Sequence, residues 1–180
     1  MVHPPVASPS SLPPAGMPWR DFRVPFGLGM LITLAGAFWD AWRHLNGLAT
    51  SESLWNPFLN PAHGTIYGGA AIMAISLVLL WRGNLALPLA VGTRSKIVMA
   101  AGIATLLGGG LYDFWWHNAY GFADTTPWTP SHMTATAGFL ILLVTGTVSL
   151  SRDATRVVRA LFAVCLILFV ALWAMVILLT

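Results

Sequence analysis

The stretch DFWWHNAYGFADTTPWTPSH occupies residues 113–132 and connects two apolar segments of the chain. It opens with Asp113 and places His117 four residues later. It closes on Thr-Pro-Ser followed by His132. In a chain that is 57% hydrophobic, such a concentration of ionisable and imidazole groups is uncommon and indicates function rather than packing.

An earlier stretch repeats this arrangement about 70 residues upstream. Asp40 precedes His44 by four residues, and after a loop the sequence Asn-Pro-Ala leads into His63. The two copies contain four of the five histidines, and each copy opens with one of the six acidic residues. The chain is therefore organised around a duplicated pattern, and its two copies are the first candidates for a site.

The composition places this pattern in a membrane protein. Only 8% of the 180 residues are charged, whereas a soluble domain carries about 25%. A helix needs about 20 apolar residues to cross a bilayer. Five segments meet that length, at residues 25–47, 63–82, 96–118, 131–150 and 159–179. We therefore predict an all-α integral membrane fold, a bundle of about five transmembrane helices built from two tandem helical hairpins plus a C-terminal helix.

The domain organisation follows from the same segments. Residues 1–20 are rich in Pro and Ser and are expected to form a disordered cytoplasmic tail. Residues 21–180 are expected to form a single transmembrane domain. Repeat one is placed at 25–82, repeat two at 96–150, and the helix at 159–179 lies outside the repeat. A direct repeat of hairpins implies a pseudo-two-fold axis along the membrane normal.

The basic residues predict the orientation. Eight of the nine fall on one side of the five segments, and the positive-inside rule makes that side cytoplasmic. The N-terminus is then cytoplasmic in a multi-pass protein of the cell membrane. The loops at 48–60 and 119–129 then face the periplasm or the exterior. Because these charges flank apolar segments and form no patch, no nucleic-acid partner is expected. The single Cys165 excludes a disulfide within the chain.

Each hairpin is predicted to bring three metal ligands together. Asp and His at i and i+4 share one helix face, about 6 Å apart along the axis. Asn60 and Thr129 are good N-cap residues, each followed by Pro at the first helical position. His63 and His132 then lie in the first turn of a returning helix, level with the end of the preceding one. The predicted ligands are Asp40, His44, His63, Asp113, His117 and His132.

The type and number of metal sites stay open at this point. Two imidazoles and one carboxylate leave coordination positions free and suit copper, iron or zinc. The two copies could form two three-ligand sites or one shared site. Trp42 and Trp115 hold the same place in the two copies, and two roles stay open for them: members of an interfacial aromatic belt, or walls of the site. No catalytic residue beyond the ligands is assigned.

The second copy also resembles a known family. Asp113-Phe-Trp-Trp-His117, the acidic loop with Asp124, and Thr129-Pro-Ser-His132 look like the metal-binding stretch of one membrane component, the C chain, of the copper membrane monooxygenases. These are the particulate methane and ammonia monooxygenases. In that likeness Trp116 takes the place of the family's Trp. The first copy is similar to the family's later site, with Asp40 in the place of an Asn. The resemblance covers about 50 residues in two patches, and this chain is shorter than the family's C chain.

The resemblance implies a copper-binding membrane protein that hydroxylates a small apolar substrate with O2, as an oligomer or with partner membrane subunits. Three alternatives stand beside it. The chain could be a non-catalytic metal-binding or assembly subunit. It could be a b-type haem protein, because histidines on different helices can ligate haem, although the aspartates speak against this. A zinc hydrolase is a further alternative.

Overall fold

Five long helices make up the part of the chain that the structure describes. The structure is a computed structural model that describes residues 20–48, 60–85, 91–120, 128–150 and 155–180. The predicted tail and most of both predicted outer loops lie outside these ranges. The helices are α1 (Arg23–Leu45), α2 (Pro61–Trp81), α3 (Thr93–Tyr120), α4 (Pro130–Thr145) and α5 (Arg156–Leu179). A short π-helical turn, η3 (Gly146–Leu150), continues α4.

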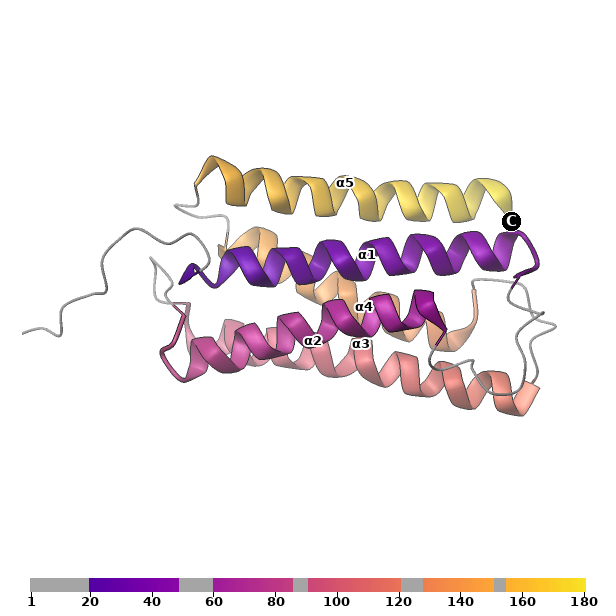
Figure 1. Cartoon of the computed structure of the whole chain (residues 1–180), viewed down its shortest axis with the longest axis horizontal. Coiled ribbons are helices and arrows are strands. Elements are labelled where there is room, and N and C mark those ends of the chain that lie inside the picture. Colours follow the sequence, from indigo (N-terminus) through magenta and orange to yellow (C-terminus); the bar gives the residue numbers. More distant parts are fainter. Residues whose placement is uncertain (1–19, 49–59, 86–90, 121–127, 151–154) are drawn as a thin grey trace, which may run out of the picture.

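The predicted fold class is confirmed. All five helices are long and apolar enough to cross a membrane, so the chain is a multi-pass membrane protein. Their ends lie within a few residues of the expected segments. The helices run nearly parallel and antiparallel to one another (Figure 1). α1 packs on α2 and α3 packs on α4, as two hairpins, and α5 packs mainly on α1.

The starts of α2 and α4 form as their N-cap residues predict. The Asn60 side chain accepts a hydrogen bond from the His63 backbone N–H over 2.8 Å, and Thr129 Oγ1 accepts one from the His132 N–H over 3.2 Å. These bonds satisfy donors that a helix start leaves unpaired. They also fix both histidines in the first turn of their helices, at the depth where α1 and α3 end.

A glycine sets the distance between the helices of each hairpin. Gly36 lies one turn before Asp40, and Gly109 lies one turn before Asp113. A Cβ atom on Gly36 would lie 2.7 Å from the backbone N of Ile66, and one on Gly109 would lie 2.5 Å from that of Ala135. The helix backbones touch at these points, as small residues permit in membrane helices. The two hairpins therefore cross in the same register, just below the predicted ligands.

Other glycines differ in how closely they approach a neighbouring helix. Gly69 and Gly102 also lie close to a neighbouring helix, which their added Cβ atoms would meet. Gly68 and Gly108 do not, because an added Cβ would meet nothing within 4 Å in the described part of the chain. These two glycines lie on the outer faces of α2 and α3.

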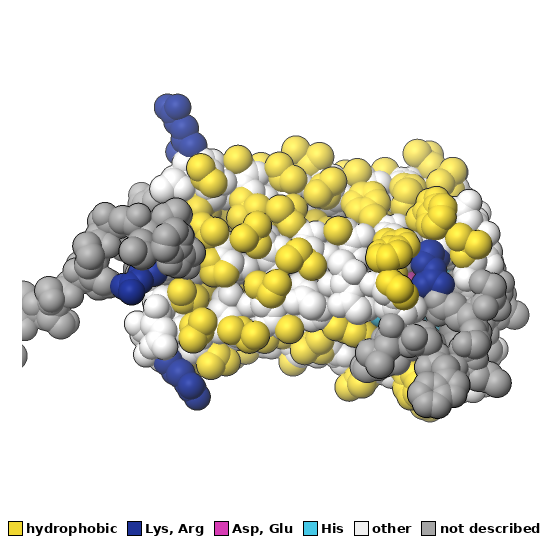
Figure 2. All heavy atoms as spheres, viewed as in Figure 1, with side chains coloured by type: hydrophobic (Ala, Val, Ile, Leu, Met, Phe, Trp, Pro, Cys, Tyr) yellow, Lys and Arg dark blue, Asp and Glu magenta, His cyan; other side chains and the backbone are white. Residues whose placement is uncertain are grey.

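Apolar side chains fill the interior and cover the outside. The core joins all five helices through buried residues such as Phe26, Met73, Leu142 and Phe162. The outer surface is also apolar, as Figure 2 shows along the length of the bundle. In water this surface would be costly, whereas in a bilayer it meets lipid. The ionisable groups gather instead at the ends of the helices.

Candidate metal centre

The six predicted ligands lie together at one end of the bundle. Asp40 and His44 come from the last turns of α1, and Asp113 and His117 from the outer part of α3. His63 and His132 come from the first turns of α2 and α4. All except His132 are buried, and His132 is partly buried. Two hairpins in one register therefore bring their polar residues to one level.

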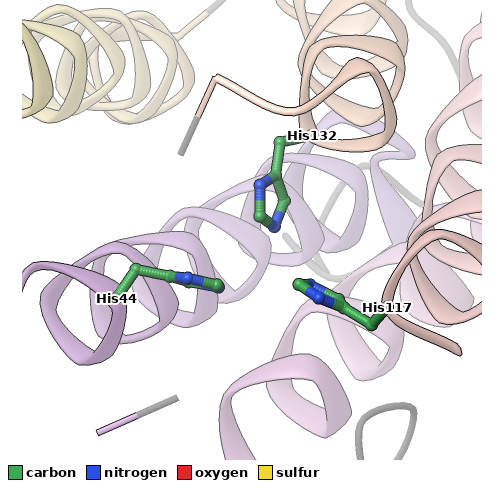
Figure 3. A group of neighbouring side chains, drawn as sticks. All are labelled: His44, His117 and His132. Atoms are coloured by element: carbon green, nitrogen blue, oxygen red, sulfur yellow. The ribbon is translucent and has the colours of Figure 1, made fainter. Parts of the chain in front are cut away.

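Three imidazoles form the tightest group. His44, His117 and His132 each offer one nitrogen, and these three atoms lie within 4.8 Å of one another. Their rings point toward a common space from α1, α3 and α4 (Figure 3). The ring centroids of His44 and His117 are 6.0 Å apart, with the rings nearly parallel. The group combines histidines from both repeats, so a metal here would belong to neither hairpin alone.

The carboxylates also join the two repeats. Asp40 Oδ1 lies 3.1 Å from Nε2 of His63, and Asp40 Oδ2 lies 3.7 Å from Nε2 of His132 in the other repeat. Asp113 lies 3.6 Å from its own His117 and 3.8 Å from His63 of the first repeat. The sequence left open whether the two copies form two three-ligand sites or one shared site. The distances between the repeats describe one shared cluster.

Hydrogen bonds assign the tautomer of His132. The Ser131 hydroxyl donates its proton to Asp113 Oδ1 over 2.7 Å, so its oxygen accepts from Thr129 Oγ1, 2.8 Å away. Thr129 has then used its only proton and must accept from Nδ1 of His132, which lies 2.9 Å away. Nδ1 therefore carries a proton, and in the neutral form of the ring Nε2 presents a lone pair to the cluster.

This tautomer explains an unpaired nitrogen. His132 Nε2 is buried and makes no hydrogen bond within the described residues, although Asp113 Oδ1 lies 3.4 Å away. A lone pair and a carboxylate oxygen are both acceptors, so no hydrogen bond forms between them. Nδ1 of His44 is likewise buried without a hydrogen bond in the described part of the chain. A buried polar atom of this kind needs an explanation, and a role as a metal ligand is one.

One difference between the two repeats affects the partners of the aspartates. Ala62 stands in repeat one where Ser131 stands in repeat two, so Asp40 has no hydroxyl partner of this kind. His63 lies at hydrogen-bonding distance from Asp40 instead. The nitrogens of His63 do not belong to the close group of three. The geometry thus places His63 beside a carboxylate and leaves the other three imidazoles facing one another.

An apolar cavity of about 110 Å³ adjoins the cluster. Asp40, His44 and His132 line it at the outer end. Its remaining walls come mainly from α1, α4 and α5. The cluster is therefore not sealed within polar neighbours, and one side of it faces an apolar space.

The structure decides between the two roles left open for a pair of tryptophans, and it adds two residues that the sequence did not predict. Trp42 and Trp115 do not wall the cluster, because they are 51% and 52% exposed. Each lies two residues after its Asp, which turns it to the opposite side of the helix. The roles of Ser131 and Gly36 were not predicted. The Gly-x-x-x-Asp-x-x-x-His spacing, present in both copies, is a signal that could have revealed the glycine.

Comparison with known proteins gives no further identification: no family model, curated protein or solved structure matches this chain.

Proposed function

We propose that this chain is a copper-binding integral membrane protein, similar to a monooxygenase subunit, that serves the O2-dependent hydroxylation of a small apolar substrate. The observation that carries the proposal is the convergence of His44, His117 and His132 from three helices within 4.8 Å. Their helices start or end at this level, and caps and glycine contacts hold them there. Such support keeps ligand positions fixed before a metal binds.

The residues fit a bound cation in charge and in donor type. Asp40 and Asp113 are buried, and buried carboxylates need a paired cation or a metal. A divalent ion would balance the two negative charges. Three imidazole nitrogens would provide ligands and leave a position open, and the tautomer of His132 already directs a lone pair inward.

The choice of copper depends on the resemblance of residues 113–132 to the copper membrane monooxygenases, since three imidazoles also suit zinc or iron. Copper would supply the one-electron chemistry that O2 activation requires. The chain itself would position the ions and the substrate. Thr129 and Ser131 would orient His132 and Asp113, and the apolar cavity would exclude water from one side of the site.

The orientation in the cell membrane is part of the proposal. Arg82, Arg94 and Arg156 lie at or beside the helix ends opposite the cluster. By the positive-inside rule, that end is cytoplasmic and the cluster is near the periplasmic or outer surface. In intact cells, a membrane-impermeant thiol reagent should label Thr125→Cys but not Ser8→Cys. Labelling of Ser8→Cys alone would reverse the orientation.

Oxygen consumption tests the catalytic part. Membranes containing the chain, with copper supplied, should consume O2 when a small apolar substrate is added. His117→Ala should abolish this, and His3→Ala should not, because His3 lies far from the cluster in sequence and outside its pattern. Bound copper without substrate-dependent O2 consumption would instead identify a non-catalytic metal-binding or assembly subunit.

A further inference from the structure

We infer that the apolar cavity beside the cluster is a binding chamber for one small uncharged molecule, of benzene size or smaller. As a substrate chamber it rests on the proposed function, whereas its affinity for apolar molecules requires no metal. The inference starts from the position of the cavity. Thr33 and His44, both on α1, lie at its inner and outer ends, so it extends along about 16 Å of that helix.

The lining of the cavity determines what it can bind. Leu34, Leu106, Phe139, Phe169 and Leu172 supply alkyl and aromatic walls. Beyond the cluster residues, the polar side-chain groups of the lining are the hydroxyls of Thr33 and Thr136 and the indole N–H of Trp173. Thr33 donates its proton to the backbone carbonyl of Ile66 over 3.4 Å, so it is already engaged. A charged or strongly polar ligand would lose its hydration here without replacement.

The volume indicates the size of ligand that the cavity, which is only partly enclosed, can hold. About 110 Å³ is smaller than the cavity of roughly 150 Å³ that binds benzene or xenon in an engineered protein interior. A molecule of several carbon atoms fits within this volume, whereas a whole lipid acyl chain would extend beyond it. The occupant that we infer is therefore a small free molecule dissolved in the membrane.

Helix α5 gives the chamber its far wall. Phe169, Leu172, Trp173 and Val176 line the cavity from α5, although α5 contributes none of the six ionisable residues. Phe169 also stacks against Phe139 of α4, with ring centroids 5.7 Å apart. This role accounts for a helix that has no counterpart in the repeat: α5 lines the apolar side of the site.

Xenon tests the chamber directly, because it is apolar, small and visible by anomalous scattering. Crystals of the purified chain under xenon pressure should show xenon among Leu34, Phe139 and Leu172. Ala37→Leu adds bulk to the lining and should abolish that xenon site. Ala35→Leu, on the exposed face of the same helix, should leave it unchanged. If Ala37→Leu does not fold, Thr136→Leu replaces it in this test, because it fills the cavity from α4.

Three outcomes would overturn the inference: an empty cavity in the wild-type chain, a lipid or detergent chain occupying it, or equal xenon occupancy in the wild-type and filled variants. The metal content of the same preparations is measured separately. Xenon binding without metal would contradict the proposed function and leave the chamber standing. Metal binding without xenon binding would contradict the chamber and leave the proposed metal site standing.

Discussion

Four of the six ionisable side chains of the cluster have a close neighbour that limits where they can point. Ser131 holds Asp113, Thr129 holds the His132 ring, and His63 lies against Asp40. Neighbours of this type fix the orientation of metal ligands and raise their basicity. Thr129 has two roles here, because it is the N-cap of α4 and also orients the ring of His132.

Ser131→Ala tests this positioning. The variant leaves the buried Asp113 carboxylate without its hydroxyl donor and removes the bond that constrains Thr129. We expect metal affinity to fall about 10- to 100-fold, as for other residues that orient ligands. Competition with a chelator of known affinity measures the change, and circular dichroism monitors helix content.

Thr134→Ala is the matched control on the same helix. Its hydroxyl donates to the carbonyl of Pro130 within α4, away from the cluster. Metal affinity should stay at the wild-type value. Equal losses in the two variants would show that any hydroxyl deletion in α4 weakens the site, and Ser131 would then have no special role.

At the scale of helices, the contacts of Gly36 and Gly109 set the level at which the cluster forms. In both hairpins the glycine precedes the Asp by one turn and meets the residue that follows the returning His by three positions. The same crossing occurs twice although the surrounding side chains differ. Backbone contact at one point, more than side-chain packing, therefore aligns the ends of the helices.

Gly109→Val and Gly108→Val form a pair that tests this crossing. A Cβ at Gly109 would lie 2.5 Å from the Ala135 backbone, whereas one at Gly108 would meet nothing within 4 Å among the described residues. We expect Gly109→Val to lose about 1–3 kcal/mol of stability, as overpacked sites do, and to lose metal affinity as well. Thermal unfolding in detergent compares the two variants. Equal melting temperatures would contradict the close contact.

The sequence predicted much of this element-level structure, for physical reasons. Apolar length alone locates the five spans, and the Asn60 and Thr129 caps with their prolines locate the starts of α2 and α4. The relation between hairpins was not predictable, because local spacing cannot state which imidazoles of different repeats meet. The outward direction of Trp42 and Trp115 could have been predicted from helical periodicity, because each lies two residues after its Asp and so points away from the cluster.

For the whole molecule, the central claim is that two hairpins make one centre. Each repeat contributes an aspartate and two histidines, yet the closest imidazoles are His44 from the first repeat with His117 and His132 from the second. Helix α5 adds no polar group to the cluster and instead lines the apolar cavity. The duplication thus provides the ligands, and the extra helix encloses the space beside them.

Bound metal per chain tests this claim most directly. The wild-type chain and the His3→Ala control should each bind one ion with the same affinity. His44→Ala and His117→Ala, one change in each repeat, should each weaken that binding by more than about 100-fold, the upper range for residues that only orient ligands. Elemental analysis of purified protein, with chelator competition, provides both numbers. If His44→Ala still bound one ion at full affinity through His117 and His132, the two hairpins would hold separate sites, and the shared centre would be contradicted.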